Sequence, residues 1–334
     1  MKIAINGFGR IGRTFFRAAT EARLNIVAVN DLTDLKTLAH LAKYDSTYGE
    51  FPGEIEVTDD DLMVNGKTIK FIQEKEPAKL PWRELGVDLV IESTGVFTQK
   101  DKAIAHIEAG AKYVVISAPA KGDEAVKTFV LGVNEDKFNP STDNVMSMAS
   151  CTTNALAPVA KVLNDAFGIE KAMMSTIHSY TMDQVLQDSP HKDLRRARAA
   201  TQSFIPTTTG ATKATAEVIP ELAGKMDGVS FRVPTSTVSM VDFVAVLKKD
   251  VTVEDVNNAL TKASEDHSFQ GALAVCGEPL VSVDFRGNPN GSIIDLLSTQ
   301  VVGGNLVKVI AWYDNEMGYS YRLTEFCRFL ENKI

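Results

Sequence analysis

Cys151 is the residue of this sequence whose position best fits a nucleophile. It lies in the segment 150–154, Ser-Cys-Thr-Thr-Asn, ahead of apolar residues with the i, i+3, i+4 spacing of an amphipathic helix, at Leu156, Val159, Ala160, Leu163 and Phe167. The first N–H groups of a helix lack partners and carry partial positive charge, so they favour a thiolate over a thiol whose ordinary pKa is about 8.5. The alternative is an inert thiol in the core.

Pro158 and the two other cysteines give further predictions. Pro158 lies inside the predicted helix, where it removes one hydrogen bond and should kink the second turn. Cys276 and Cys327 have no comparable context, and we assign both to the core.

His178 is the candidate partner of the thiol. It lies in a β-branched run, 175–180, where the alternation of a strand can direct a side chain into a cleft. A single histidine is more often structural, but a thiol is only weakly ionised at neutral pH, and a neighbouring imidazole is the usual group that activates it. Together, Cys151 and His178 predict covalent catalysis with acid–base assistance.

The chain has a net charge of −8. If its substrate is an anion, the basic side chains that bind it must therefore be clustered at the site. That charge also disfavours binding to nucleic acid or to anionic membranes. The basic cluster 192–198 is one candidate, although a solvated or interface-facing loop explains it equally well. Arg232 is suited to a forked contact with phosphate, and the hydroxyls and backbone of 205–210 suit an oxyanion.

A glycine-rich turn near the N-terminus predicts a dinucleotide site. The apolar run 2–6 leads into 7–12, Gly-Phe-Gly-Arg-Ile-Gly, and a helical pattern follows. In such a unit the three glycines allow a tight turn, the approach of backbone to a pyrophosphate, and close packing of helix on strand. Asp31 ends the next strand, nineteen residues after Gly12, where a carboxylate binds the adenosine ribose. NAD is preferred over NADP, because this carboxylate would repel a 2′-phosphate and Leu32 offers no positive charge.

The rest of the first half predicts a parallel sheet covered on both faces. Apolar runs at 88–92, 113–117 and 128–133 fit strands, and 101–109 fits a helix between the first two. Polar turn residues within 59–66 indicate a small hairpin insertion.

After Cys151 the pattern changes to long β-branched runs, at 173–180, 229–233 and 238–247, interrupted by helical stretches at 212–220 and 253–264. This predicts a sheet-based α+β domain with an antiparallel component.

Length and composition fit a globular protein with two domains. The 334 residues are 44% hydrophobic, and no apolar run approaches the roughly 18 residues that span a bilayer. The N-terminus lacks the features of a signal peptide, and three cysteines argue against a disulfide framework and are too scattered to suggest a metal site. We expect a cytoplasmic protein without a metal.

Six motifs, in order and spread along the whole chain, resemble those of the phosphorylating glyceraldehyde-3-phosphate dehydrogenases. They begin at Asn6 (NGFGRIGR), Ala149 (ASCTTN), His178 (HSYT), Leu194 (LRRARAA), Pro206 (PTTTG) and Trp312 (WYDNE). The resemblance implies an α/β fold with a Rossmann-type, doubly wound NAD-binding domain at 1–149, completed by the last helix at 316–334. An α+β catalytic domain with a mixed or antiparallel sheet is expected at 150–315.

In that family a thiolate attacks the aldehyde to form a thiohemiacetal, hydride passes to NAD, and inorganic phosphate releases the resulting thioester as an acyl phosphate, a step of glycolysis. The resemblance makes Cys151 the nucleophile and His178 its base. It assigns the substrate's phosphate to Thr181, Asp183 and Arg232, the attacking phosphate to Ser150, Thr152, Thr209 and Gly210, and the border of both to Arg196.

The predicted cofactor site combines the glycine turn, the ends of the strands and the resemblance. Asn315 is expected to hold the nicotinamide carboxamide, with Tyr319 nearby. The full set is Asn6, Gly7, Gly9, Arg10, Ile11, Asp31, Leu32, Lys75, Thr94, Gly95, Ser117, Asn315 and Tyr319.

Three positions depart from the family pattern. Ser189 precedes Pro190 where NAD-using members commonly have leucine, Met182 replaces a residue that is usually small or polar, and Lys75 stands where an arginine often touches adenine. By the same resemblance, the loop 182–203 reaches the cofactor of a neighbouring subunit in a homotetramer.

Three alternative functions stay open at this point. The first is the sibling erythrose-4-phosphate dehydrogenase, which hydrolyses its thioester. The second is a cysteine hydrolase built on Cys151 and His178, for which the glycine turn and Asp31 have no use. The third is a noncatalytic scaffold, which would not be expected to retain both residues.

Overall fold

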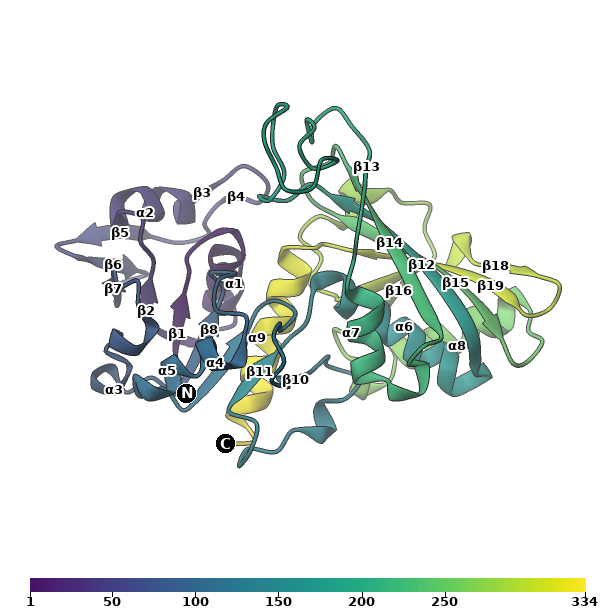
Figure 1. Cartoon of the computed structure of the whole chain (residues 1–334), viewed down its shortest axis with the longest axis horizontal. Coiled ribbons are helices and arrows are strands. Elements are labelled where there is room, and N and C mark those ends of the chain that lie inside the picture. The colour runs from purple at the N-terminus through teal and green to yellow at the C-terminus, as the bar shows by residue number, and fades with distance from the viewer. The chain divides into compact units, whose positions relative to one another are not determined.

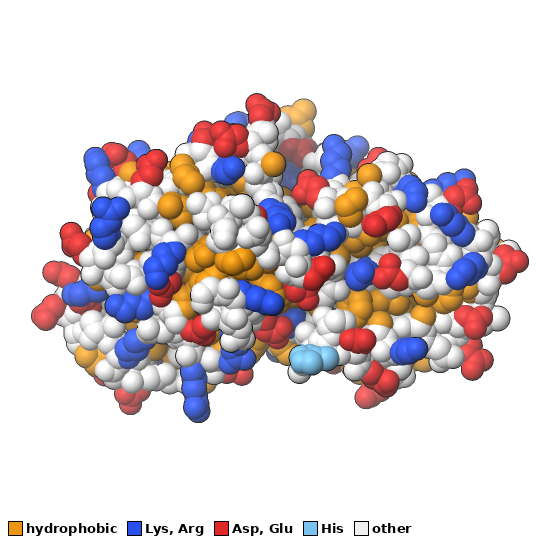
Figure 2. All heavy atoms as spheres, turned by 90° about the horizontal axis from the view of Figure 1, so that it is seen from below, with side chains coloured by type: hydrophobic (Ala, Val, Ile, Leu, Met, Phe, Trp, Pro, Cys, Tyr) orange, Lys and Arg blue, Asp and Glu red, His pale blue; other side chains and the backbone are white.

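The computed structural model describes all residues from 1 to 334, and the chain forms two compact units (Figure 1). The first unit comprises 1–129, 137–149 and 323–334, and the second comprises 130–136 and 150–322. None of the helices combines the length and the apolar composition needed to cross a membrane. On the face shown in Figure 2, basic and acidic side chains are interspersed, so neither sign of charge dominates it.

The first unit is built on a nine-stranded sheet. In spatial order its strands are β10 (Lys127–Thr128), β11 (Val145–Ser147), β9 (Tyr113–Ile116), β8 (Leu89–Glu92), β1 (Lys2–Asn6), β2 (Asn25–Asn30), β7 (Lys67–Ile72), β6 (Asp61–Val64) and β5 (Ile55–Thr58). The seven strands from β10 to β7 are parallel, whereas β6 and β5 are antiparallel. The strand order reverses beside β1, which confirms the predicted doubly wound sheet and marks where such sheets bind ligands.

Short helices and turns complete this unit. The helices are α1 (Arg10–Glu21), α2 (Leu35–Lys43), α3 (Trp82–Leu85), α4 (Lys100–Ala103) and α5 (Ala105–Glu108), and β3 (Tyr44–Asp45) pairs with β4 (Gly49–Glu50). The hairpin prediction is confirmed, because β5, β6 and β7 turn at Asp59 and Asn65, which have positive φ.

Two predictions for the first unit are wrong in detail. The run 128–133 is not a strand, because only its first residue lies in β10 and the chain then turns at Gly132, whose φ is +81°. The residues from Val130 belong to the second unit, whose apolar core holds Val130. The predicted helix 101–109 is divided at Ile104 into α4 and α5.

The second unit is built on a mixed sheet of eight strands. In order they are β13 (Ile205–Thr207), β14 (Met226–Val233), β12 (Ile169–Ser179), β15 (Ser239–Leu247), β19 (Leu306–Tyr313), β17 (Ser292–Asp295) and β16 (Leu273–Cys276), and β18 (Gln300–Val302) pairs with β19. Only the pairs β12–β14 and β16–β17 are parallel, which confirms the predicted antiparallel component. Its helices are α6 (Cys151–Phe167), α7 (Ala211–Val218), α8 (Val253–Ser264) and α9 (Met317–Glu331), and the residues of α9 from Leu323 belong to the first unit.

Helix α6 lies in the core of the second unit. Leu156, Val159 and Leu163 are fully buried, and they pack with Val241 and Phe243 of β15. The helix is continuous through Pro158.

The two other cysteines differ from each other. Cys327 is buried in α9 as predicted, whereas Cys276 is only partly buried and packs against the edge of a small apolar cluster formed by Val238, Phe285 and Ile293. Cys276 ends β16, remains partly exposed, and has its sulfur 3.6 Å from the carbonyl oxygen of Glu278.

Candidate active site

The start of α6 holds Cys151 at the first helical position. Ser150 is the N-cap, and its Oγ accepts a hydrogen bond from the Thr153 N–H at 3.0 Å. An N-cap of this kind uses one of the unpartnered N–H groups of the first turn and leaves the others with their positive potential. The predicted helix start is therefore confirmed, and the thiol lies beside the positive end of a 17-residue helix.

His178, near the end of β12, approaches this thiol. The distance between Cys151 Sγ and His178 Nε2 is 3.5 Å. On the other side of the ring, Nδ1 lies 2.7 Å from the carbonyl oxygen of Ser179. The Ser179 carbonyl can only accept, whereas Arg232 Nη1, 3.0 Å from the same Nδ1, can only donate. The carbonyl contact is the shorter of the two, so we assign the proton to Nδ1, and Nε2 then presents its lone pair to the sulfur. The predicted pairing of the two residues is thus present, in the tautomer that a base requires.

The surroundings of the pair oppose charge on either group alone. Burial raises the pKa of the Cys151 thiol, and Arg232 and the N–H groups at the start of α6 only partly offset this effect. Burial, together with the positive charge of Arg232, lowers the pKa of His178. A neutral thiol and a neutral imidazole are therefore favoured at rest, and transfer of the proton creates two charges that stabilise each other.

Arg232 links the pair to a second group of predicted residues. It is the register partner of His178 in the parallel pair β12–β14. Its Nη1 donates to the Ser179 carbonyl oxygen at 3.2 Å and to Thr181 Oγ1 at 3.0 Å, and its buried Nε has no partner. A buried guanidinium N–H without an acceptor fits a site for an anion.

Asp183 and Arg196 extend this group. The Asp183 carboxylate accepts hydrogen bonds from Thr181 and from Arg196, and Arg196 Nε donates to Thr207 Oγ1 at 3.0 Å. The structure therefore brings Thr181, Asp183, Arg196 and Arg232 together next to His178.

The residues predicted to bind the attacking phosphate make hydrogen bonds within the protein. Ser150 Oγ serves the helix cap, and Thr152 Oγ1 lies 2.9 Å from the hydroxyl of Tyr313. Thr209 Oγ1 accepts from the Ala211 N–H at 3.2 Å, and Gly210 is the N-cap of α7. No hydrogen bond joins the Ser150 and Thr152 pair to the Thr209 and Gly210 pair.

A groove at the carboxyl ends of β1, β2 and β8 contains much of the predicted cofactor site. Its volume is about 620 Å³, and its lining includes Asn6, Gly7, Gly9, Asp31, Leu32, Lys75 and Thr94. Residues absent from the prediction also line it, namely Asn30, Glu74, Glu76, Pro77, Ala78, Ser93, Val96, Phe97 and Ala105. Asn30 ends β2, Ala105 begins α5, and the others follow β7 or β8. All except Ala105 could have been identified from their position at or after the end of a strand.

The glycine turn has the geometry that the sequence implies. Gly7 has φ +93°, and a Cβ on Gly12 would lie 2.1 Å from the Gly7 carbonyl oxygen. The Asp31 carboxylate accepts hydrogen bonds from the N–H groups of Phe8, at 2.7 Å, and Thr33, at 2.9 Å. Such a turn, with a carboxylate beside it, fits a dinucleotide.

Six predicted cofactor residues do not line the groove, four in the first unit and two, Asn315 and Tyr319, in the second. The Arg10 guanidinium forms an ion pair with Asp45, and Ser117 Oγ donates to the Glu92 carbonyl oxygen at 3.1 Å. Ile11 lies in the first turn of α1, and Gly95 is exposed, with φ +74°.

Asn315 and Tyr319 belong to the second unit. Asn315 Oδ1 accepts from Ser179 Oγ at 2.8 Å and from Ser239 Oγ at 2.9 Å, which leaves Nδ2 as the donor for a ligand. Tyr319 is buried, and burial raises the pKa of its phenol.

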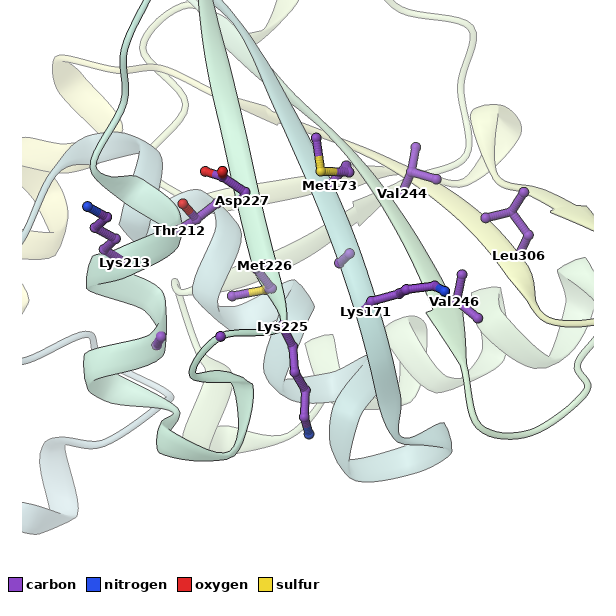
Figure 3. Close-up of a pocket in the computed structure, with 13 residues that line it drawn as sticks. Lys171, Met173, Thr212, Lys213, Lys225, Met226, Asp227, Val244, Val246 and Leu306 are labelled. Carbon is purple, nitrogen blue, oxygen red and sulfur yellow. The ribbon is translucent and has the colours of Figure 1, made fainter.

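Tyr313 was missed by the sequence analysis. Its buried hydroxyl lies 2.9 Å from both Thr152 Oγ1 and Thr176 Oγ1, and its ring contacts that of His178 edge-on at 6.0 Å. One sequence signal could have indicated that Tyr313 is buried. Apolar residues alternate along β19, and this alternation places Tyr313 on the buried face with Val307, Val309 and Ala311. A separate hollow of about 670 Å³ (Figure 3) has neither Cys151 nor His178 in its lining.

Comparison with known proteins agrees with this arrangement. The NAD binding domain of glyceraldehyde 3-phosphate dehydrogenase matches residues 1–100, and the C-terminal domain of the same enzyme matches residues 150–315. The chain is 56% identical to glyceraldehyde-3-phosphate dehydrogenase of Geobacillus stearothermophilus and to that of Priestia megaterium, over 100% of this chain and 99% of each relative. It is 55% identical to glyceraldehyde-3-phosphate dehydrogenase 1 of Bacillus subtilis over the same shares. With a groove of the dinucleotide-binding type in one unit and a thiol paired with an imidazole in the other, the chain belongs to the glyceraldehyde-3-phosphate dehydrogenase family, whose members are NAD-dependent oxidoreductases acting on aldehydes.

Proposed function

We propose that this chain oxidises glyceraldehyde 3-phosphate with NAD and inorganic phosphate to 1,3-bisphosphoglycerate. The observation that carries the proposal is the contact of 3.5 Å between Cys151 Sγ and His178 Nε2, with the opposite ring nitrogen donating to the Ser179 carbonyl. The names of the relatives favour the three-carbon aldehyde over erythrose 4-phosphate.

His178 can serve each proton transfer through the same nitrogen. Its Nε2 takes the thiol proton as the Cys151 sulfur attacks the aldehyde carbon, and returns it to the oxygen that becomes the thiohemiacetal hydroxyl. NAD, when bound, supplies the hydride acceptor for the oxidation. Nε2 removes the hydroxyl proton during that oxidation, which leaves a thioester. Attack by an oxygen of inorganic phosphate then forms the acyl phosphate and breaks the bond from carbon to sulfur. The departing thiolate takes back the proton held on Nε2, and the proton of the attacking phosphate is released to solvent.

Two anion sites are part of the proposal. Arg232 and Thr181, which touch each other and adjoin His178, bind the phosphate of the aldehyde, with Asp183 and Arg196 as their neighbours. The attacking phosphate binds at Ser150, Thr152, Thr209 and Gly210. In this second assignment the O–H groups of Ser150 and Thr152 donate to the phosphate, while their oxygens can still accept from the Thr153 N–H and the Tyr313 hydroxyl.

The cofactor assignment follows the groove. Asp31 binds the adenosine ribose and the turn at Gly7 and Gly9 binds the pyrophosphate, while Asn315 binds the carboxamide. We also propose a homotetramer, in which the loop 182–203 contributes to the site of a neighbouring copy.

Initial rates of NAD reduction test the proposal. Glyceraldehyde 3-phosphate and erythrose 4-phosphate are each supplied with inorganic phosphate, with arsenate, and with neither. We expect rapid oxidation of the three-carbon aldehyde that depends on phosphate or arsenate. Oxidation at the same rate without either oxyanion, or a preference for erythrose 4-phosphate, contradicts the proposal.

A further inference from the structure

A fully buried polar cluster lies behind the groove of the first unit. It consists of Glu92 at the end of β8, His106 in α5 and Trp82 in α3, which are at most 1% exposed. None of these side chains lines the groove, so none can touch a bound ligand. A buried polar group must find partners within the protein, and the identity of those partners shows what this cluster holds in place.

Hydrogen bonding fixes the tautomer of His106. The Trp82 indole can only donate, and its Nε1 lies 3.0 Å from His106 Nδ1, so Nδ1 is the acceptor. The proton is therefore on Nε2, which lies 3.1 Å from Glu92 Oε2 and donates to it. The indole and the imidazole thus form a chain that ends on the carboxylate.

Glu92 in turn holds two residues that line the groove. Its Oε2 also accepts from Asn6 Nδ2 at 2.5 Å, and its Oε1 accepts from the Thr94 N–H at 2.9 Å and from the Thr94 hydroxyl. Asn6 Oδ1 then accepts from Asn30 Nδ2 at 2.7 Å. One carboxylate thus links the ends of β1, β2 and β8, where all three of these partners line the groove.

The backbone of the glycine turn packs against Thr94, so the position of Thr94 also affects the turn. A Cβ on Gly7 would lie 2.6 Å from the Thr94 nitrogen, so these two backbones are in close contact. A shift of Thr94 must therefore move the turn or open a gap beside it. All four groups that Glu92 binds are donors, and a neutral amide at this position would turn one of its two acceptors into a donor facing donors.

We propose that Glu92, His106 and Trp82 are positioning residues for NAD. His106, held by Trp82, orients the Glu92 carboxylate, and the carboxylate holds Asn6 and Thr94 in the conformation that binds the cofactor. The proposal rests on the assignment of the groove as the cofactor site.

The test is calorimetric titration of the full-length chain with NAD and with ADP-ribose. For Glu92→Gln and His106→Leu we expect the dissociation constant of NAD to rise about tenfold or more, and the KM for NAD to rise in parallel, while kcat at saturating NAD falls less than about threefold. His106→Gln, whose amide can still donate to Glu92, should bind NAD within about threefold of the unsubstituted chain.

Asp143→Asn is the matched control. Asp143 is also a buried carboxylate of the first unit that accepts several hydrogen bonds, from Lys127 Nζ and the Asn139 N–H at 2.8 Å and from Thr142, but it precedes the amino end of β11. Its substitution should lower the melting temperature and leave the NAD dissociation constant within about threefold.

The proposal is overturned if Glu92→Gln and His106→Leu bind NAD as tightly as Asp143→Asn does. If Glu92→Gln cannot be obtained folded, the NAD dissociation constants of the other variants decide. His106→Leu and Trp82→Phe should then raise this constant about tenfold or more, and His106→Gln should leave it within about threefold of the unsubstituted chain. Asp31→Gly tests the groove separately. If Asp31→Gly weakens NAD binding and the Glu92 and His106 variants do not, the positioning role fails while the cofactor site stands. If Asp31→Gly has no effect on NAD binding, the groove assignment itself fails.

Discussion

The nitrogen of His178 that faces away from Cys151, Nδ1, determines which nitrogen can accept the thiol proton. Because Nδ1 donates to the Ser179 carbonyl, only Nε2 can accept the thiol proton. Arg232 Nη1 lies 3.0 Å from the same Nδ1, and its charge disfavours an imidazolium. The same charge favours the thiolate. Arg232 therefore acts on both members of the pair, and it makes the base ready to return its proton.

Replacement of the nucleophile gives the first prediction. Cys151→Ser should lower the rate of oxidation by at least about 10³, since a serine hydroxyl is far less acidic than a thiol and no other group in the site replaces the sulfur. NAD affinity should change less than about twofold, because Cys151 does not line the groove and is not among the residues assigned to the cofactor. Stopped-flow reduction of NAD and calorimetric titration measure the two quantities. A variant with a tenth of the original activity contradicts the assignment.

Arg232 gives the second prediction, which concerns pH. Its positive charge lowers the pKa of Cys151, so its removal must raise the pH at which the thiol becomes reactive. Arg232→Gln should shift the midpoint of alkylation by iodoacetamide upward by about one pH unit, and Arg232→Lys, which retains the charge, should shift it much less. Equal midpoints for the unsubstituted chain and Arg232→Gln would show that the guanidinium does not influence the sulfur.

At the scale of elements, the N-cap of α6 combines a structural role with a proposed catalytic one. Ser150 Oγ satisfies the Thr153 N–H, while the proposed function also requires this hydroxyl to bind the attacking phosphate. Helix α8 offers a cap with only the first role. Its Thr252 hydroxyl accepts from the Asp255 N–H at 3.1 Å, and the Thr252 N–H donates to the Asp255 carboxylate at 2.8 Å.

The third prediction compares these two caps. Ser150→Ala and Thr252→Ala should each lower the free energy of unfolding by about 1 kcal/mol, because each leaves a first-turn N–H unsatisfied. Only Ser150→Ala should also raise the KM for inorganic phosphate, by about fivefold or more. Urea unfolding and phosphate titration of the rate provide the measurements. A phosphate KM that is unchanged in Ser150→Ala would place the attacking phosphate elsewhere.

The elements that follow from local patterns were predictable from the sequence. The helix that starts at Cys151, the turn at Gly7 and the strand that ends before Asp31 each depend on spacing within about a dozen residues. The prediction of a strand at 128–133 is wrong because Val130 and Val133 pack in the core of the second unit rather than extend the sheet of the first. Periodicity identifies burial, but it does not say which core a segment enters.

Other parts of the site depend on register between distant strands. Arg232 reaches His178 because β12 and β14 pair in parallel with these two residues opposite each other. Thr152 and Tyr313, whose hydroxyls meet at 2.9 Å, are 161 residues apart in sequence. A single sequence contains no signal that specifies such a register. The residue type of Arg232 indicated a phosphate contact, but its place in the site came only from the resemblance, and Tyr313 was missed.

At the scale of the whole molecule, the second unit leaves apolar side chains uncovered. Met174 of β12 is 1% exposed in the core beneath α6, whereas its neighbour Met173 points to the other face of the sheet and is 62% exposed. Figure 3 shows Met173, Val244 and Leu306 along that face. In the loop 182–203, Met182 is 89% exposed. Apolar surface of this kind on neighbouring elements is typical of an interface, and the proposed homotetramer supplies further copies of this chain to cover it.

The fourth prediction concerns this assembly. The unsubstituted chain should sediment with the mass of four chains, and Met173→Asp should reduce that mass to two chains or one, because a carboxylate buried between two copies of the sheet lacks a partner. Val253→Asp is the control, since Val253 is also exposed but lies in the first turn of α8, where an acidic side chain is favourable. Analytical ultracentrifugation at several protein concentrations distinguishes the species. If Met173→Asp sediments as a tetramer, this face of the sheet is not an interface. If the unsubstituted chain sediments as a monomer, the loop 182–203 cannot complete a neighbouring site, and every catalytic group must come from a single chain.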